Sequence, residues 1–197
     1  VTSASPDSSK DQLIVATNAA FEPFEYTKGG KYLGIDMEIA DALAKKLGKE
    51  LVIQNMEFDA VCLSVGQHKC DIAMAGLTIK ESRKEYVTFT NPYYNAAQRI
   101  IVPSDNTEFD DAVSAEDVIE ILKGKDSSTK IAVQNGTTGK TFCEGDENQG
   151  FAPLPVTTVG YKNGALAVQD MLNGNADYVI IDSAPAKCIT EAINKNA

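Results

Sequence analysis

The chain has few of the residues on which catalytic centres usually depend. Its 197 residues include one histidine, His68, which stands in a polar turn after a predicted helix. That setting favours a solvated turn residue over a general base. The Gly-x-Ser-x-Gly motif of serine hydrolases is also absent. No catalytic residue is therefore predicted.

Cysteine is too scarce and too scattered for a metal centre. The four cysteines form no Cys-x-x-Cys pair, and His68 is the one imidazole that could join them as a ligand. We therefore predict no metal and no cofactor. Two interpretations stay open: small buried residues, or one or two disulfides. Among the three possible pairings, Cys62–Cys70 with Cys143–Cys188 keeps each bridge within one half of the chain.

Long apolar runs and net positive charge are missing as well. No run approaches the roughly 18 apolar residues that cross a bilayer. Asp and Glu number 28 against 18 Lys and Arg, a formal net charge of −10, which argues against nucleic acid and anionic lipid as partners. Residues 1–12 are rich in serine, contain Pro6 and are predicted to form a flexible tether. A signal or lipid-anchor segment could have preceded them.

What the chain does have is an alternation of short apolar runs and amphipathic segments. Apolar runs predict strands, and apolar residues on one face predict helices. Gly48 marks the end of the first helix, and the Thr78–Glu81 spacing predicts a capping box that starts another. The expected order is strand 13–17, loop 18–34, helix 36–47, strand 51–53, helix 58–65, strand 71–75, helix from 78, strands near 87–89 and 99–102, helix 115–123, strand 130–133, helix from 136–138, strand 178–181 and helix 184–193. Such alternation predicts a mostly parallel, layered α/β fold.

The two halves share one pattern. A helix, a glycine, an aspartate and an apolar strand occur in order over residues 58–75 and again over residues 163–181. Gly76 and Asp182 each follow the aspartate of their copy by five residues. Ligands of open α/β sheets bind beyond the carboxyl ends of the strands. The repeat therefore predicts two lobes with a ligand cleft between them.

Two charged residues are suited to the end groups of a zwitterion. Arg83 lies five residues after Thr78, near a predicted helix start, where a guanidinium and backbone N–H groups could bind an α-carboxylate together. A surface arginine is the alternative. Asp182 follows four apolar residues and so ends a strand; it could bind an α-ammonium or cap the next helix.

Other side chains could complete such a site. Gly136, Thr137 and Thr138 offer N–H and hydroxyl donors, and Phe21, Phe24 and Phe58 could form walls around a side chain. Phe24 is equally suited to the core.

Six stretches together resemble the polar amino-acid-binding proteins of ATP-driven importers. The resemblance extends from about residue 13 to residue 193. The stretches are 16–26 (Ala-Thr-Asn-Ala-Ala-Phe-Glu-Pro-Phe-Glu-Tyr), 34–36 (Gly-Ile-Asp), 75–79 (Ala-Gly-Leu-Thr-Ile) with Arg83, 89–94 (Phe-Thr-Asn-Pro-Tyr-Tyr), 136–138 (Gly-Thr-Thr) and 176–182 (Ala-Asp-Tyr-Val-Ile-Ile-Asp).

The resemblance implies an α/β, two-lobe periplasmic-binding-protein-like fold of type II, with mostly parallel sheets and flanking helices. Lobe 1 would span residues 13–95 and lobe 2 residues 96–197, with a hinge near 93–98. The implied function is extracytoplasmic, in the periplasm or on the cell surface as a lipoprotein: capture of a free polar L-amino acid and delivery to the membrane permease of an ABC importer.

The resemblance also implies roles for site residues. Arg83 would bind the α-carboxylate and Asp182 the α-ammonium, while Phe21 and Phe58 flank the ligand's side chain. The full implied ligand-binding set is Asn18, Phe21, Phe58, Ala75, Gly76, Thr78, Arg83, Gln134, Thr137, Thr138 and Asp182.

The chain departs from the family pattern at two places. Relatives that hold cationic side chains have an aspartate where this chain has Asn18, which weakens the case for a strongly basic ligand. Gln134 and Ile181 also stand at side-chain positions, so a pocket of mixed character is expected. Relatives continue past the last helix and return to lobe 1, so the C-terminal part of that lobe is expected to be missing from a sequence that stops at Ala197.

Two rival functions fit the same fold. An enzyme resembling cyclohexadienyl dehydratases would need an acid or base, for which Glu22 and Glu25 are the nearest candidates. A sensor module of a receptor or kinase would use the same clamp.

Overall fold

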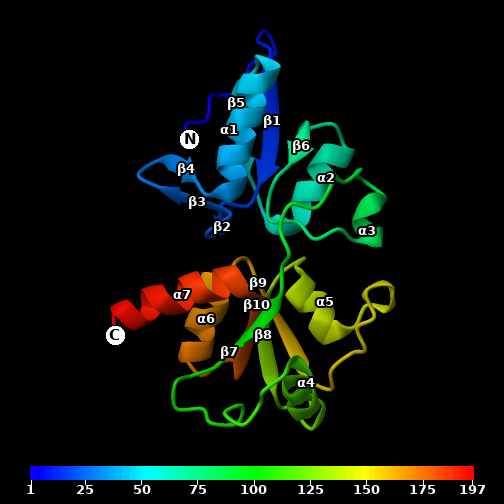
Figure 1. Ribbon diagram of the computed structural model, residues 1–197, viewed down its shortest axis with the longest axis vertical. Coiled ribbons are helices and arrows are strands. Elements are labelled where there is room, and N and C mark those ends of the chain that lie inside the picture. Colours follow the sequence, from blue (N-terminus) through cyan, green and yellow to red (C-terminus); the bar gives the residue numbers. More distant parts are fainter. The chain divides into compact units, whose positions relative to one another are not determined.

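A computed structural model describes all residues from Val1 to Ala197. The chain divides into two compact units, Val1–Asn95 and Ala96–Ala197. Both are mixed α/β layer structures, and four of the seven strand pairs are parallel, which confirms the predicted fold class (Figure 1). No helix has the length and apolar character needed to cross a membrane.

The first unit is built on a parallel sheet of order β5-β1-β6. Its strands are β1 (Gln12–Thr17), β5 (Glu50–Asn55) and β6 (Ile72–Ala73). Leu13 and Val15 of β1 pack in one core cluster, and Ile14 and Ala16 pack in another. Because successive side chains of a strand point to opposite faces, this sheet is covered on both sides.

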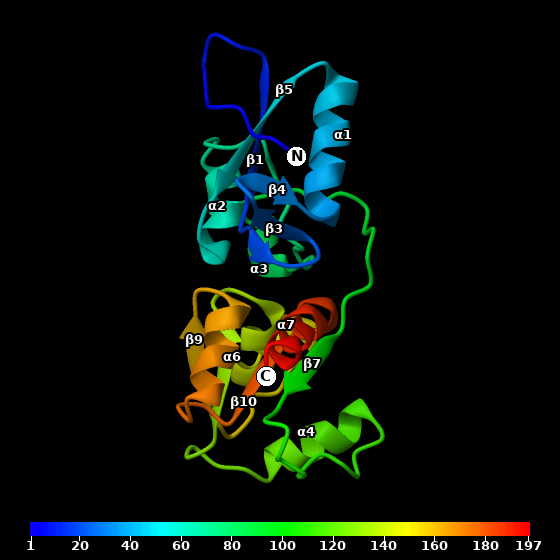
Figure 2. The same cartoon turned by 90° about the vertical axis from the view of Figure 1, so that its left-hand side faces the viewer.

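Two helices provide those covers. α1 (Ile35–Leu47) packs on β1 and β5, and α2 (Val61–Gly66) packs on β1 and β6. Figure 2 shows the two helices on opposite sides of β1. α1 ends as predicted at Gly48, whose φ of 67° is the left-handed C-cap conformation that glycine adopts without steric cost. α2 follows a 3₁₀ turn, η1 (Phe58–Ala60).

Three predictions for this unit are wrong. The predicted loop over 18–34 contains a small antiparallel sheet of β2 (Ala20–Phe21), β3 (Glu25–Lys28) and β4 (Lys31–Leu33). The capping box at Thr78 does not form, because the helix there, α3, covers only Glu81–Lys84 and has Lys80 as its N-cap. Residues 87–89 form no strand.

The N-terminal segment is also more ordered than a flexible tether. Val1 exchanges two backbone hydrogen bonds with Tyr32 of β4. Further along, the N–H of Ala4 donates to the Leu51 carbonyl, and Oγ of Ser3 accepts from the N–H of Ile53 at 2.7 Å. β5 is an edge strand with backbone groups that need partners, and residues 1–4 supply them.

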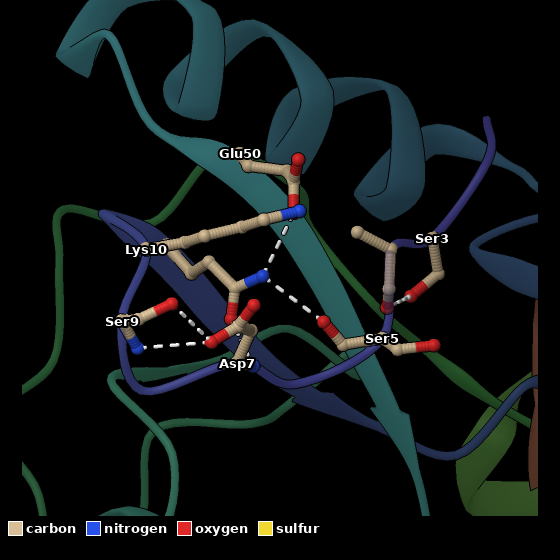
Figure 3. A network of polar contacts seen from close by, with 8 residues as sticks. Ser3, Ser5, Asp7, Ser9, Lys10 and Glu50 are labelled. Carbon is tan, nitrogen blue, oxygen red and sulfur yellow. Dashed lines mark hydrogen bonds and ion pairs between the residues drawn. The ribbon is translucent and has the colours of Figure 1, made fainter.

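Side chains extend this contact toward β1. Gln12 donates to the Ser5 carbonyl at 3.0 Å and to Glu50 at 2.8 Å, while Asp7 accepts from the N–H and hydroxyl of Ser9. Figure 3 shows this network beside β5. Residues 1–12 therefore belong to the first unit.

The second unit has a four-stranded sheet of order β7-β10-β8-β9. Its strands are β7 (Gln98–Ile101), β8 (Lys130–Gln134), β9 (Thr157–Tyr161) and β10 (Tyr178–Asp182). β7 is antiparallel to β10, and the other pairs are parallel. β9 is missing from the sequence prediction.

Five further elements surround this sheet, of which four are α-helices. α6 (Gly164–Leu172) and α7 (Ser183–Lys195) pack on each other and on β10. α5 (Thr138–Glu144) packs on β8, β9 and β10, and Leu122 of α4 (Ala115–Lys123) lies in the same core cluster as Cys143 of α5 (Figure 1). The remaining element is a 3₁₀ turn, η2 (Glu147–Gln149).

The sequence repeat has a structural counterpart in each unit. Asp71, which precedes β6, donates its N–H to the Ile14 carbonyl and accepts from the Ile14 N–H, both at 2.8 Å. Asp177, which precedes β10, makes the same two bonds with Lys130, also at 2.8 Å. Each aspartate thus sets the register of its strand against the neighbouring parallel strand.

The predicted disulfides are tested by the state of three cysteines. Cys62, Cys70 and Cys143 are buried free thiols. Neither of the predicted disulfides, Cys62–Cys70 and Cys143–Cys188, is therefore formed.

Candidate functional site

The predicted ligand-binding residues of the first unit gather at the carboxyl edge of its parallel strands. Asn18 follows β1, and Ala75 and Gly76 follow β6, which lies beside β1 in parallel register. Ala75 is 1% exposed and belongs to the core under this edge. Loops at such an edge are the usual location of ligand sites in α/β sheets.

Arg83 is held against this edge by two contacts. Its Nη1 donates to the Thr78 carbonyl at 2.7 Å, and its guanidinium carbon lies 5.4 Å from the centre of the Phe58 ring. The second contact is a cation–π interaction, which fixes the plane of the guanidinium. Phe58 is 7% exposed, so its ring supports Arg83 from the core side.

The contact between Arg83 and Thr78 differs from the predicted one. The sequence pattern placed Arg83 beside the N–H groups of a helix start at Thr78. In the structure the chain at Thr78 is not helical, and the guanidinium binds the carbonyl of that residue instead. None of the four residues of α3 is buried, so no packed face stabilises a longer helix that would reach back to Thr78.

Gly76 is constrained at this edge by its backbone conformation and by two neighbours. It adopts φ 57°, and its N–H donates to Oδ2 of Asp36 at 2.7 Å. A Cβ built on it would stand 3.2 Å from the ring of Phe21. Phe21 is 3% exposed, so the ring and the glycine backbone pack directly on each other.

Asn18 has a structural bond at this edge. Its Nδ2 donates to the Met56 carbonyl at 2.8 Å, which ties the end of β1 to the turn after β5.

Asp36 is a residue of this half-site that the sequence interpretation missed. It is completely buried at the start of α1 and accepts a second hydrogen bond, on Oδ1, from the hydroxyl of Tyr93 at 2.6 Å. Tyr93 is 55% exposed, but partial desolvation of its hydroxyl and the hydrogen bond to Asp36 raise the pKa of Tyr93 above its usual range, which keeps the phenol a proton donor. Both residues stand in stretches that carry the family resemblance, and that was the available signal.

The second unit gathers its predicted residues in the same way. Gln134 ends β8 and Asp182 ends β10, and these two strands are parallel neighbours. Thr137 is the N-cap of α5, with its hydroxyl donating to the Gln134 carbonyl at 2.7 Å, and Thr138 begins the helix. Gln134 donates from Nε2 to the Lys162 carbonyl at 3.3 Å.

Asp182 does not cap the helix that it precedes. It is the N-cap residue of α7, yet its side chain makes no capping hydrogen bond. Oδ1 instead accepts from Nε2 of Gln98 at 2.6 Å. Gln98 lies directly opposite on the antiparallel strand β7. A role for Gln98 could not be predicted from the sequence, because a single polar residue at the start of an apolar strand is common.

Neither unit offers a metal centre or a histidine-based catalytic group. No group of three or more His, Cys, Asp or Glu side chains is arranged to hold a metal ion. His68 is exposed in a turn with φ 59°. The charged side chains predicted as ligand-binding residues are the Arg83 guanidinium in the first unit and the Asp182 carboxylate in the second.

Known proteins provide an independent comparison. Residues 13–192 match the family described as bacterial extracellular solute-binding proteins, family 3. The arginine-binding extracellular protein ArtP of Bacillus subtilis is 33% identical over 134 residues, which are 68% of this chain and 49% of ArtP. A putative ABC transporter arginine-binding protein 2 of Escherichia coli is 32% identical over 188 residues, which are 94% of this chain and 68% of that protein.

Solved structures agree with these relatives. The ancestral amino acid-binding protein AncCDT-1, described as a precursor of cyclohexadienyl dehydratase, has a TM-score of 0.78 and 33% identity, and the match covers 93% of this chain and 75% of that one. An ancestral arginine-binding protein bound to glutamine has a TM-score of 0.76 and 33% identity, with coverages of 93% and 74%.

The family match covers nearly the whole chain, well beyond what a shared motif would give. The chain spans about half the length of ArtP and about two thirds of arginine-binding protein 2. Its family is extracellular, which places it outside the cytoplasm. The chain belongs to family 3 of the bacterial extracellular solute-binding proteins.

Proposed function

We propose that this chain is a receptor for a free L-amino acid with a polar side chain, which it delivers to the permease of an ABC importer. One observation carries the proposal: charged groups of opposite sign lie near the carboxyl edge of the parallel strands in the two units, the Arg83 guanidinium in the first and the Asp182 carboxylate in the second. These are the two charges that an amino-acid zwitterion requires.

In the proposed mechanism the two units act as lobes that close on the ligand. Arg83, assisted by Gly76 and Thr78, binds the α-carboxylate through charge-assisted hydrogen bonds. Asp182 binds the α-ammonium, and Thr137 and Thr138 add donors from the start of α5. Because only the closed form makes both sets of contacts, the ligand stabilises closure, and the importer recognises that form.

The side chain of the ligand would lie among Asn18, Phe21, Phe58 and Gln134. Relatives described as arginine-binding and histidine-binding proteins, and an ancestral arginine-binding protein bound to glutamine, make these three amino acids the first candidates. Asn18 and Gln134 are neutral amides, which favour a hydrogen-bonding side chain and do not require a charged one.

We also propose that the chain binds without catalysing a reaction, although AncCDT-1 is described as the precursor of an enzyme. Glu22 is exposed, and Glu25 is fully buried beside Gly76. Incubation with prephenate and arogenate checks this point, because dehydratase turnover would overturn it.

A screen of the twenty amino acids by thermal shift tests the main proposal. A specific ligand raises the apparent melting temperature by mass action. Calorimetric titration of Arg83→Ala should then show no binding, while Arg99→Ala, which removes the chain's other arginine from an exposed position on β7, should bind normally. Retained affinity in Arg83→Ala would refute the assignment.

A further inference from the structure

Two residues near the boundary between the units, Tyr93 and Gln98, each donate a hydrogen bond to a buried carboxylate. Tyr93 precedes the Asn95–Ala96 boundary by two residues, and Gln98 is the third residue after it. Each donates one hydrogen bond of 2.6 Å to a carboxylate in its own unit. The acceptors, Asp36 and Asp182, are 0% and 8% exposed.

The contact of Tyr93 is linked to the proposed carboxylate site through Asp36, which also binds Gly76. Asp36 uses Oδ1 for the Tyr93 hydroxyl and Oδ2 for the Gly76 N–H. A buried carboxylate needs such donors, since desolvation of an ionised group is costly without them. The position of Gly76, which contacts Phe21 and belongs to the loop before Thr78, is thus linked to Tyr93.

The second contact acts on the proposed ammonium site directly. Gln98 and Asp182 are cross-strand partners on β7 and β10. Nε2 of Gln98 donates to Oδ1 of this carboxylate, which makes no capping hydrogen bond to α7.

Gln98 also carries a cost that packing does not explain. Its Oε1 is buried and has no hydrogen-bond partner. An unsatisfied buried carbonyl generally destabilises a fold, and a residue that keeps one usually has another role. An apolar side chain of similar shape would avoid this cost but would remove the donor to Asp182, so the bond to that carboxylate accounts for glutamine at this position.

We propose that Tyr93 and Gln98 are positioning residues for ligand binding. Tyr93 acts through Asp36 on the loop that contains Gly76, and Gln98 acts on Asp182. The segment that joins the two units therefore carries the supports of both half-sites. The inference rests on the proposed function and extends it to two residues that need not touch the ligand.

Substitutions that remove only the donor test the inference. Tyr93→Phe removes one hydroxyl, and Gln98→Met removes the amide from a side chain of nearly the same size. Each should weaken binding about five- to tenfold, since a hydrogen bond to a charged group is lost. L-Arginine is the first probe, replaced by the best ligand of the thermal-shift screen if another amino acid binds more tightly. Calorimetry on the full chain measures the affinity.

Matched controls separate positioning from a general loss of structure. Tyr94→Phe removes the neighbouring hydroxyl, and Gln169→Met changes an exposed glutamine of α6; both should leave the affinity unchanged. The unliganded melting temperature of each variant is measured beside its affinity, because removing a donor to a buried carboxylate can also lower stability. A purely structural residue would lower the melting temperature and leave the affinity unchanged.

A double-mutant cycle tests the route of the effect. Tyr93→Phe combined with Asp36→Asn should be strongly non-additive in affinity, because both changes break one chain of contacts. Tyr93→Phe combined with Gln98→Met should be additive, because the two act on different half-sites. If Asp36→Asn does not fold, the affinities of Tyr93→Phe, Gln98→Met and their double mutant, with the controls, still test the inference.

The outcomes distinguish this inference from the proposed function. Wild-type binding that Arg83→Ala abolishes, together with unchanged affinity in Tyr93→Phe and Gln98→Met, overturns the inference alone. A wild type that binds none of the twenty amino acids overturns both.

Discussion

Gln98 and Asp182 stand opposite each other on antiparallel strands, and the amide of Gln98 donates to the carboxylate at 2.6 Å. This pairing explains why Asp182 does not cap α7, although it occupies the N-cap position. An aspartate at a strand end, held by a neighbouring strand, has the fixed orientation that the proposed ammonium site requires. The first prediction follows from it.

Asp182→Asn should weaken amino-acid binding by about tenfold or more, with little change in fold. Asparagine keeps an oxygen that can accept from Gln98, so the strand pairing persists. It loses the negative charge, and with it the charge-assisted bond to the α-ammonium, which contributes about 1.5–3 kcal/mol. Calorimetry and thermal melting of the same sample measure both quantities, and wild-type affinity in the variant would contradict the role of Asp182.

Two glycines of the second unit should differ in how well they tolerate substitution by alanine. A Cβ on Gly139 of α5 would stand 2.8 Å from the backbone oxygen of Ile180, whereas a Cβ on Gly164 of α6 would meet only the ends of the Ile181 and Ile189 side chains. Backbone yields less readily than a rotatable side chain. Gly139→Ala should lower the free energy of unfolding by about 1–3 kcal/mol and Gly164→Ala by less. Denaturant unfolding measures the order, and the reverse order would refute the argument.

The pair of Glu108 and Lys125 predicts a pH-dependent contribution to stability. Hydrogen bonds from Lys125 and then from Tyr178 lower the pKa of Glu108. The unfolded chain therefore binds the proton more readily, so this stabilisation is complete above the unfolded pKa of about 4.3 and is lost as pH falls through the folded value.

Glu108→Gln should accordingly melt at a lower temperature than the wild type at neutral pH. At pH about 2 the two proteins should melt alike, since the wild-type carboxyl is then protonated in both states. An equal difference in melting temperature at both pH values would show that the contact is not electrostatic. Because the pair is partly exposed, the neutral-pH difference should be small.

Cys143 is expected to be chemically silent in the folded protein. It is 1% exposed, and burial raises the pKa of its thiol to about 12. The thiolate is the reactive species, so iodoacetamide at mildly alkaline pH should leave Cys143 unmodified. In denaturant the same residue should react fully. Mass spectrometry of peptides from the two samples decides, and rapid native labelling would mean that α5 opens readily.

Local pattern was enough for the elements with a clear period or boundary signal. The helix ending at Gly48, the strands β1, β8 and β10, and the helix α4 occur close to the predicted ranges. The short strands β2, β3 and β4 were missed because two to four residues among proline and glycine carry no measurable period. The capping box at Thr78 failed because that signal requires a following helix with a packed face.

The sequence by itself determined the α/β class, the family and the identity of the charged residues, since these depend on composition, periodicity and ordered motifs. Only the tertiary structure decided which groups those charges contact. The bonds from Gln98 to Asp182 and from Tyr93 to Asp36 join residues 84 and 57 positions apart. The N-terminal segment likewise found its place on β5 because an edge strand offers unpaired backbone groups. Hydrogen bonds of this kind depend on which strands become neighbours, and that is settled by the packing of the whole unit.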